Sequence, residues 1–393
     1  MEKLKVAVLF GGKNPEHEVS IISALQVLNA FDKKRYDLSP VYISKKGQWF
    51  LGDDSFLNPE TFKDLDKAVD GKREMLLTPR VDFGGLTEVE KGLIFLRRLI
   101  TKRIDVFFPV FHGRFGEDGS IQGLFEMANV AYVGCNVQAS AIGMDKAISK
   151  LVAAGLDIPV MKDLLITKAE WRKATAKEMD RITNRLKMPL YVKPARLGST
   201  IGVSRVTSTS ELKEALEVAF FYDSRVLVEE ELKNAREVNI ALLGNDPYKC
   251  SVCEEPLARQ KTLSFEDKYL GRQDTSKGLA GAKRVVPASI KDRARKKIEA
   301  YAQKLFTHID GKGIARLDFL ISKNEQKICF NEINTIPGSL AFYLWQKSGL
   351  SFSALLDHLI KLSLKNKKER DALTTTFKSN ILVNFEGIKG AKV

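Results

Sequence analysis

Short apolar runs alternate with helical periodicity over the first third of the chain. Residues 5–10 form an apolar run that ends at a Gly-Gly pair. Asn14 and Pro15 follow, which we expect to serve as the N-cap and first turn of a helix. Further apolar runs cover residues 38–43 and 105–111. This pattern predicts a doubly wound, Rossmann-like α/β domain whose ligands bind at the carboxyl ends of the strands.

The pattern is weaker elsewhere in the chain. Residues 50–103 indicate loop and helix, with no assignable chemistry. The segment 112–119, HGRFGEDG, indicates a shaped loop at a strand end, with a plain turn as the alternative. Towards the C-terminus, residues 355–362 indicate a helix, a charged tail is expected from Lys365, and one further strand is possible at 381–385.

Residues 314–334 contain two short apolar runs joined by a polar turn, which predicts a β-hairpin. Side chains two apart on a strand share a face. Arg316 and Asp318 therefore share one face of the first strand, and Glu332 and Asn334 share one face of the second. The opposite faces, which we expect to pack on a core, carry Leu317, Phe319, Ile321, Cys329 and Ile333.

The polar face of this hairpin carries two carboxylates, an amide and a guanidinium. Hard oxygen ligands without His or Cys suit a Mg²⁺ ion that keeps waters and shares phosphate oxygens. Arg316 could hold a phosphate or an oxyanion, and a tight turn at Pro337-Gly338 would bring backbone N–H groups to the same place. The alternative is surface salt bridging on an edge hairpin.

A second set of polar residues suggests a nucleotide site. Lys193 ends a predicted strand, and the glycine- and hydroxyl-rich segment 198–204 follows; it could close over phosphates, although the Walker A spacing is absent. Strand 226–231 ends in acids, and Glu237 comes next. Lysines that bind the phosphates and a carboxylate that binds the ribose hydroxyls would together hold a nucleotide. The long polar segment 264–287 is either disordered or a lid, and we favour a lid.

Composition fits a soluble protein of two or three domains, with 393 residues, 44% hydrophobic and 28% charged. The chain shows no apolar run of membrane-spanning length and no signal-peptide pattern, so we expect a cytoplasmic protein without membrane contact. Cys250 and Cys253 form a lone CxxC, which indicates chance strand cysteines more than zinc or redox chemistry. The net charge of +14 raises a nucleic-acid hypothesis, but the basic residues are dispersed and we expect no specific nucleic acid.

In combination, the motifs GGKNPEHEVS, HGRFGEDGSIQG, MDK, KPARLGSTIGVSRV, EEELKNAREV, EDKY, RLDF and NEINTIPG resemble those of the D-alanine–D-alanine ligases of the ATP-grasp superfamily. The resemblance covers about residues 4–362 and implies an α/β fold, with α+β character in the ATP-grasp part, in three domains. The implied divisions are a Rossmann-like preATP-grasp domain at 4–134, a central ATP-grasp subdomain at 135–233, a C-terminal ATP-grasp domain at 234–363 with its lid at 264–287, and a basic extension of unassigned role at 364–393.

The resemblance implies that two D-alanines are joined with ATP and two Mg²⁺, or Mn²⁺, through a D-alanyl phosphate, for peptidoglycan precursors. It also implies a homodimer. The nucleotide residues would be Lys146, Lys193 and the lid Lys268 on phosphates, Glu230, Glu231, Leu232 and Lys233 along the adenine, and Glu237 on the ribose. The metal ligands would be Asp318, Glu332 and Asn334. The catalytic residues would be Arg316 and the Gly338 N–H on the tetrahedral intermediate, Glu16 on the first ammonium, and Ser199 and Tyr269 in a network with Glu16.

The sequence departs from the family after NEINTIPG. Tyr343 stands where the family has a serine that helps bind the second substrate's carboxylate. Tyr343 could donate the same hydrogen bond from a longer side chain, Ser339 could substitute, or the second pocket could be reshaped. Tyr269, which the related depsipeptide ligases lack, favours an amino acid over D-lactate. The alternative is therefore a related ligase with a different second substrate, such as D-serine.

Overall fold

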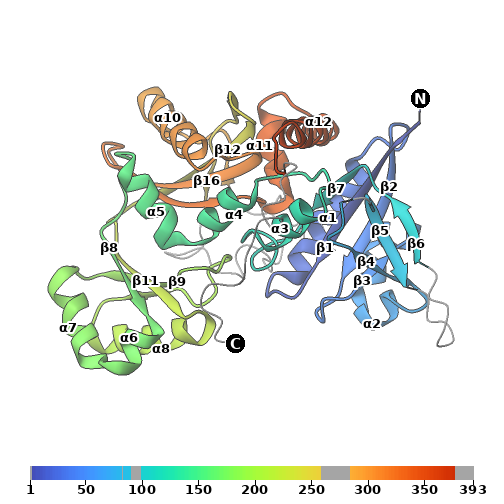
Figure 1. Cartoon of the computed structure of the whole chain (residues 1–393). Helices are drawn as coiled ribbons and strands as arrows, with labels where there is room; N and C mark the ends of the chain where they lie inside the picture. The colour runs from blue at the N-terminus through green and yellow to red at the C-terminus, as the bar shows by residue number, and fades with distance from the viewer. Residues whose placement is uncertain (1, 82, 90–98, 258–283, 377–393) are drawn as a thin grey trace, which may run out of the picture.

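The computed structural model describes residues 2–81, 83–89, 99–257 and 284–376. Its strands form three main sheets (Figure 1). The first has the strand order β6-β5-β4-β3-β2-β1-β7, and β1, β2 and β7 are parallel. Its elements are β1 (Leu4–Gly11), α1 (His17–Ala30), β2 (Tyr36–Ile43), β3 (Trp49–Leu51), α2 (Leu65–Ala68), β4 (Arg73–Leu77), β5 (Gly85–Val89), β6 (Leu99–Arg103), β7 (Val106–Pro109) and α3 (Ser120–Met127).

The second sheet is antiparallel, in the order β10-β9-β11-β8. Alternate residues of β9 and β11, such as Val192 and Val228, pack with the helices in one core. The strand period of two therefore turns Lys193 and Glu229 to the opposite face. The elements are β8 (Asp163–Thr167), α6 (Lys168–Lys173), α7 (Thr175–Arg185), β9 (Leu190–Pro194), β10 (Ser204–Val206), α8 (Thr209–Tyr222) and β11 (Arg225–Glu230).

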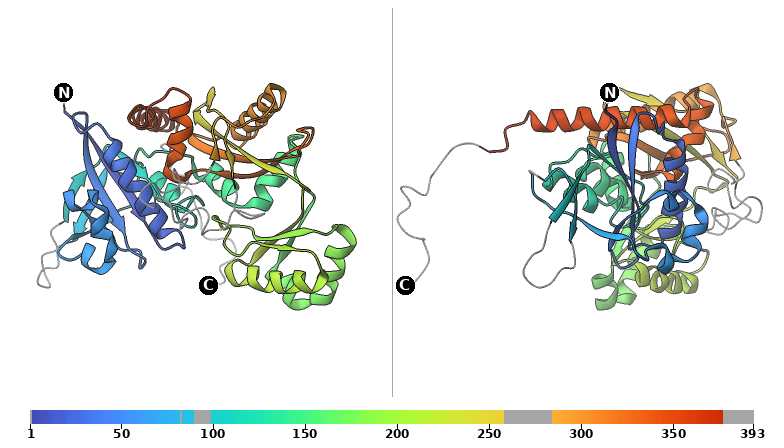
Figure 2. Two further views of the ribbon diagram at one scale, coloured as in Figure 1. Left: turned by 180° about the vertical axis from the view of Figure 1, so that it is seen from behind. Right: turned by 90° about the vertical axis from the view of Figure 1, so that its right-hand side faces the viewer.

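The third sheet, also antiparallel, has the order β13-β12-β16-β17. Its core includes side chains from the helices α4, α5 and α10. In Figure 1 and the left view of Figure 2, the first and second sheets lie at opposite ends of the molecule. The elements are α4 (Val137–Met144), α5 (Lys146–Gly155), β12 (Arg236–Gly244), β13 (Tyr248–Cys250), β14 (Glu255–Pro256), β15 (Arg284–Val285), α10 (Asp292–His308), β16 (Gly313–Ile321) and β17 (Ile328–Asn334).

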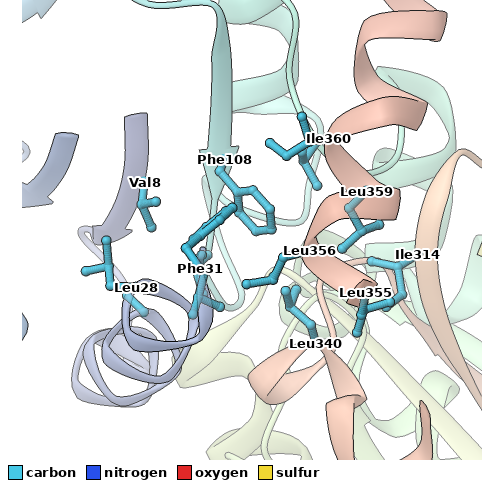
Figure 3. Packing of buried hydrophobic residues seen from close by; sticks show 14 of the residues in the cluster. Val8, Leu28, Phe31, Phe108, Ile314, Leu340, Leu355, Leu356, Leu359 and Ile360 are labelled. Carbon is cyan, nitrogen blue, oxygen red and sulfur yellow. The ribbon is translucent and has the colours of Figure 1, made fainter. Parts of the chain in front are cut away.

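The C-terminal helices α11 (Phe342–Lys347) and α12 (Phe352–Asp371) join the first sheet to the third. Leu356 and Ile360 of α12 share a buried cluster with Phe31 and Phe108 of the N-terminal part (Figure 3). At the rim of this contact, the Tyr36 hydroxyl donates a hydrogen bond of 2.7 Å to Asp357. The N-terminal domain is thus fixed against the part of the chain that carries the predicted metal ligands.

The predicted fold class and three-domain layout are confirmed, but several element boundaries were wrong. Helix α1 begins at His17, and Asn14 is not its N-cap. The Asn14 side chain instead accepts a hydrogen bond from the Glu16 N–H at 2.9 Å and donates one to the Gly11 carbonyl at 3.2 Å. Asn14 therefore shapes the turn between β1 and α1 and fixes the backbone of Glu16.

The prediction of loop and helix at 50–103 was wrong in part: the region holds α2 and the short 3₁₀ helices at 54–57 and 59–63, but it also holds the strands β3 to β6. These strands are short and add antiparallel to the edge of the parallel part. Leu51, Met75 and Leu86 enter the core from separate short strands, so the periodic signal along the sequence is weak. The expected strand at 381–385 lies outside the described residues.

The charged tail does not begin at Lys365, because α12 continues to Asp371. Arg370 donates a hydrogen bond of 2.7 Å to the Val130 carbonyl and lies 5.6 Å from the Tyr132 ring centre. This contact anchors the last turn of the helix. All four cysteines are free thiols. In the part of the chain described here, no helix has both the length and the apolarity needed to span a membrane.

Candidate active site

The predicted hairpin is present as β16 and β17, which pair antiparallel. Asp318 lies opposite Glu332, and Arg316 lies opposite Asn334. The register shifts after Asp318, so that Phe319 pairs with Phe330 and Asn331 is the extra residue of a bulge. The bulge therefore leaves the pairs Arg316–Asn334 and Asp318–Glu332 in register, and these four side chains share one face of the hairpin as predicted.

The bulge corrects one expectation for the core face. Ile328 and Phe330 enter the core cluster, whereas Cys329 pairs with Leu320 on the other face and is absent from that cluster. Cys329 is fully buried as expected, but its assignment to the same face as Leu317 and Ile333 was wrong, because one inserted residue exchanges the faces of all residues before it. Asn331 gains a different role: its side-chain oxygen accepts a hydrogen bond of 3.4 Å from Lys193.

Asp318 is the most enclosed of the predicted metal ligands, with 1% of its surface exposed. The Arg316 guanidinium donates to both of its oxygens at 2.7 Å, and the Asn334 amide donates to it at 3.2 Å. Burial, together with the charges of Glu237 and Glu332, raises the pKa of Asp318 although Arg316 opposes the shift. A cation placed at Asp318 would stabilise its ionised form.

The lysines predicted to contact phosphates reach the hairpin from α5 and from the second sheet. The Lys146 ammonium, at the start of α5, lies 3.0 Å from a Glu332 oxygen and donates to the Leu197 carbonyl at 2.7 Å. Lys193, on β9, pairs with Glu229 and reaches Asn331. Cations from the second sheet and α5 and carboxylates from the third sheet thus share one site.

The donor set at the hairpin fits magnesium. Asp318, Glu332 and Asn334 offer hard oxygens on neighbouring positions of two paired strands. Among the described residues, no three His, Cys, Asp or Glu side chains gather as metal ligands. Two carboxylates and one amide leave coordination positions for waters and phosphate oxygens, which is the way Mg²⁺ is held in nucleotide sites.

Glu16, predicted to bind the first ammonium group, is 6% exposed at the start of α1. It accepts a hydrogen bond from the Ser199 hydroxyl, so the structure brings this predicted pair together. A Cβ atom at Gly113 or Gly198 would lie 2.8 Å or 3.0 Å from a Glu16 oxygen. Glycine at both positions therefore allows two loops to approach this carboxylate. The predicted third member, Tyr269, lies outside the described residues, as does Lys268.

The loop at 112–119 holds the turn that contains Gly338. Glu117 accepts hydrogen bonds from the N–H groups of Gly113, at 2.7 Å, and Ile336, at 3.1 Å. Burial and the neighbouring Glu16 raise the pKa of Glu117 to about 8. A loop of the N-terminal domain thereby fixes the position of the Gly338 backbone, which the motif alone did not reveal.

A second link between this loop and the turn passes through His112. Its Nε2 lies 3.0 Å from the Ser23 hydroxyl, which accepts a hydrogen bond of 3.2 Å from the Ser339 N–H. Burial lowers the pKa of His112 to about 4. The imidazole is therefore neutral in the folded protein at neutral pH.

This shift makes stability depend on pH. The unfolded chain binds a proton at His112 from about pH 6.5, which the folded chain does not bind until about pH 4, so stability is lost as the pH falls through this window. Between pH 7.5 and 5 the loss is about 2 kcal/mol for one such group. His112→Asn should remove this part of the pH dependence, measured by urea denaturation at each pH. An unchanged dependence in the variant would contradict the buried neutral imidazole.

Tyr343, the residue that departs from the family pattern, is held by two charged side chains. Its hydroxyl donates to Glu254 at 2.8 Å, and Arg284 donates to the other Glu254 oxygen at 3.0 Å. The Arg284 guanidinium lies 4.0 Å from the centre of the Tyr343 ring. The hydroxyl proton of Tyr343 is thus used in the hydrogen bond to Glu254. Ser339 is buried, with 1% of its surface exposed.

The residues predicted along the adenine and ribose lie where β11 leads into β12. Glu230 accepts a hydrogen bond of 3.0 Å from the Lys187 N–H. Glu231 binds Arg205 through bonds of 2.9 Å and 2.6 Å. Glu237 lies on β12 and accepts a bond of 3.2 Å from the Asn239 amide. Leu232 and Lys233 lie in the connection between the two strands.

Sequence reasoning missed the buried partners of the phosphate-binding lysines. Glu229 and Lys150 form an ion pair in which the two side chains are 1% and 2% exposed, and Lys193 also pairs with Glu229. Two signals were available. Strand alternation places Glu229 on the face of Lys193, and Lys150 follows Lys146 by one helical turn.

Two antiparallel four-stranded sheets that meet over lysines and carboxylates define the ATP-grasp class of enzymes. Models of the D-ala D-ala ligase N-terminus and C-terminus match residues 5–135 and 152–361. The chain belongs to the D-alanine–D-alanine ligase family. This family is ATP-dependent and normally uses Mg²⁺.

Individual relatives agree over nearly the whole chain. A D-alanine–D-alanine ligase of Chloroherpeton thalassium is 37% identical over 94% of this chain and 99% of its own length. One of Thermosipho melanesiensis is 38% identical over 93% and 95%. Among solved structures, the D-alanine–D-alanine ligase of Coxiella burnetii has a TM-score of 0.77 at 31% identity and covers 94% and 97% of the two chains. The VanG D-Ala:D-Ser ligase of Enterococcus faecalis has a TM-score of 0.76 at 32% identity, with 92% and 100% covered.

Proposed function

We propose that this chain joins two D-alanines to D-alanyl-D-alanine with ATP, through a D-alanyl phosphate, in the synthesis of peptidoglycan precursors. The observation that carries the proposal is the position of Asp318 opposite Glu332, with Lys146 reaching Glu332 from the start of α5. Such a site can hold a metal and the phosphates of one nucleotide together.

The chemistry has two steps. The carboxylate of the first D-alanine attacks the γ-phosphorus of ATP, which releases ADP and gives an acyl phosphate. The amine of the second D-alanine then attacks the acyl carbon, and phosphate leaves. Phosphorylation is required because a free carboxylate is a poor electrophile, and exclusion of water protects the acyl phosphate from hydrolysis.

Each group of residues has a role in these steps. Lys146 and Lys193 bind the nucleotide phosphates, and Glu16 binds the ammonium of the first D-alanine. Arg316 and the Gly338 N–H stabilise the oxyanion of the tetrahedral intermediate. Asp318, Glu332 and Asn334 would hold two Mg²⁺, or Mn²⁺, ions, which would neutralise phosphate charge.

The remaining assignments complete this proposal. Glu230, Glu231, Leu232 and Lys233 line the adenine, and Glu237 binds the ribose. Lys268 contacts the γ-phosphate, and Tyr269 joins Ser199 and Glu16. Family membership supports a cytoplasmic homodimer that acts on D-alanine and ATP; sedimentation of the purified chain tests the dimer.

Phosphate release from ATP and D-alanine tests the reaction directly. We expect phosphate that depends on D-alanine and Mg²⁺, with one D-alanyl-D-alanine formed for each phosphate. The control omits D-alanine, and a second control supplies L-alanine. Release at background level with millimolar D-alanine would contradict the substrate assignment.

The second candidate is ligation of D-alanine to a different D-amino acid, such as D-serine. Two observations favour it: Tyr343 occupies the position of the family serine, and the VanG D-Ala:D-Ser ligase is among the similar structures. A panel of second substrates decides between the two. If D-serine outcompetes D-alanine at equal concentration, the second candidate replaces the first.

Tyr343→Phe tests whether the phenol shapes the second pocket. The change removes the hydroxyl hydrogen bond to Glu254 but keeps the ring beneath Arg284. We expect KM for the second D-alanine to rise about tenfold, while KM for ATP stays constant, because a lost hydrogen bond to a charged group costs about 1.5 kcal/mol or more. Phe342→Leu on the same helix is the control. An unchanged KM would exclude Tyr343 from the second pocket.

A further inference from the structure

The ion pair beside the predicted nucleotide site is a group of three charges. Glu229, on β11, receives Lys150 on one carboxylate oxygen and Lys193 on the other. The side chains of Lys150, Glu229 and Lys193 are 2%, 1% and 12% exposed. Asp163 on β8 also carries charge next to this group, and burial raises its pKa. Water therefore does little to screen these charges from one another.

The three members differ in what they face. Lys193 is the most exposed, and it extends to Asn331 at the bulge of the metal-binding hairpin. Lys150 lies one helical turn after Lys146 on α5 and points to Glu229. Lys193 thus faces the site, and Lys150 stands behind Glu229.

The third charge, on Lys150, matters when a phosphate binds Lys193. Glu229 and Lys193 alone would form a neutral pair, and a phosphate that took Lys193 would leave Glu229 as an unpaired buried carboxylate. Breaking a buried ion pair in this way is strongly unfavourable. With Lys150 present, the three charges carry a net charge of +1, and Glu229 keeps a cation when Lys193 turns to a phosphate.

We propose that Lys150 is a positioning residue for nucleotide binding: it holds Glu229 and so leaves the charge of Lys193 available to the phosphates of ATP. The inference rests on the proposed function, because it takes ATP as the ligand of Lys193. Lys150 itself contacts no substrate in this scheme. Its effect on ATP passes entirely through Glu229.

The test is the affinity for ATP measured by calorimetry with Mg²⁺ and without D-alanine. In Lys150→Met, a change of similar volume, Glu229 keeps Lys193 as its partner, so the ligand-free variant should fold. We expect its Kd for ATP to rise at least about tenfold, and the rise in Tm that ATP produces to shrink accordingly. Lys296→Met on α10 is the matched control, because Lys296 is 69% exposed and pairs with Asp292 across a turn of its own helix.

Rescue separates this role from a structural one. In the double variant Lys150→Met with Glu229→Gln, residue 229 no longer competes for Lys193 as a carboxylate, and the affinity for ATP should return to near the wild-type value. Weak binding that persists in the double variant would overturn the inference, as would wild-type affinity in Lys150→Met.

A further variant decides the question if Lys150→Met fails to fold. Glu229→Gln alone frees Lys193 and should bind ATP at least as tightly as the wild type; weaker binding would overturn the inference. A wild-type chain that binds ATP but joins no D-alanine would contradict the proposed function, and the comparison of affinities would still decide the role of Lys150.

Discussion

Glu332→Gln should lower kcat by about a thousandfold or more, because the lost charge serves the metals and the phosphates together. Glu332 lies opposite Asp318 on the hairpin and 3.0 Å from the Lys146 ammonium. A neutral amide binds Mg²⁺ poorly and does not pair with Lys146 as a carboxylate does. Steady-state phosphate release at saturating ATP and D-alanine, over a range of Mg²⁺ concentrations, measures the effect.

The same substitution at Glu60 is the control. Glu60 is 64% exposed and pairs with the exposed Lys63 three residues later, so Glu60→Gln should have wild-type activity. Turnover of Glu332→Gln within a few-fold of wild type at low Mg²⁺ would refute a role for Glu332 in binding the metals. Recovery only at high Mg²⁺ would support that role, because it would show weakened metal affinity.

Arg316→Lys should lower kcat by about a hundredfold while the Kd for ATP changes little. Arg316 binds Asp318 with two parallel hydrogen bonds of 2.7 Å. Lysine keeps the charge but cannot present two donors in the same plane. Loss of one donor to a developing oxyanion costs about a hundredfold or more in rate. The measurements are kcat at saturating substrates and the Kd for ATP, each compared between the variant and the wild type.

Arg295→Lys on α10 controls for a general effect of the substitution. Arg295 is 41% exposed and pairs with Asp292 and Glu299 on its own helix, so its replacement should leave kcat unchanged. If Arg316→Lys instead weakens ATP binding and leaves kcat intact, Arg316 contacts the nucleotide and not the intermediate.

The hairpin could be predicted from sequence because alternation by two fixes which side chains share a face. Arg316, Asp318, Glu332 and Asn334 meet as expected. The bulge could not be predicted, because an inserted residue such as Asn331 leaves no change in composition or in the length of the apolar run. The misplacement of Cys329 follows from that one residue.

Partners that depend on tertiary approach were also beyond the sequence. Tyr343 contacts Glu254, which directly precedes β14, and Arg284, which lies on β15. The pairing of these two strands brings both residues to Tyr343. Glu229 reads as one of three adjacent acids, and only burial between Lys150 and Lys193 distinguishes it from its neighbours. Local pattern specifies faces of strands and helices, whereas the choice of ionic partner is made by the packing of distant segments.

The most direct test of the central claim is the position of metal ions in crystals of this chain grown with Mn²⁺ and an ATP analogue. Anomalous scattering should show two Mn²⁺ ions, one held by Asp318 and Glu332 and one by Glu332 and Asn334, with phosphates between them and Lys193. Mn²⁺ bound away from these three residues, or a nucleotide whose phosphates do not approach Lys193, would contradict the claim that this hairpin and the facing lysines form one nucleotide site.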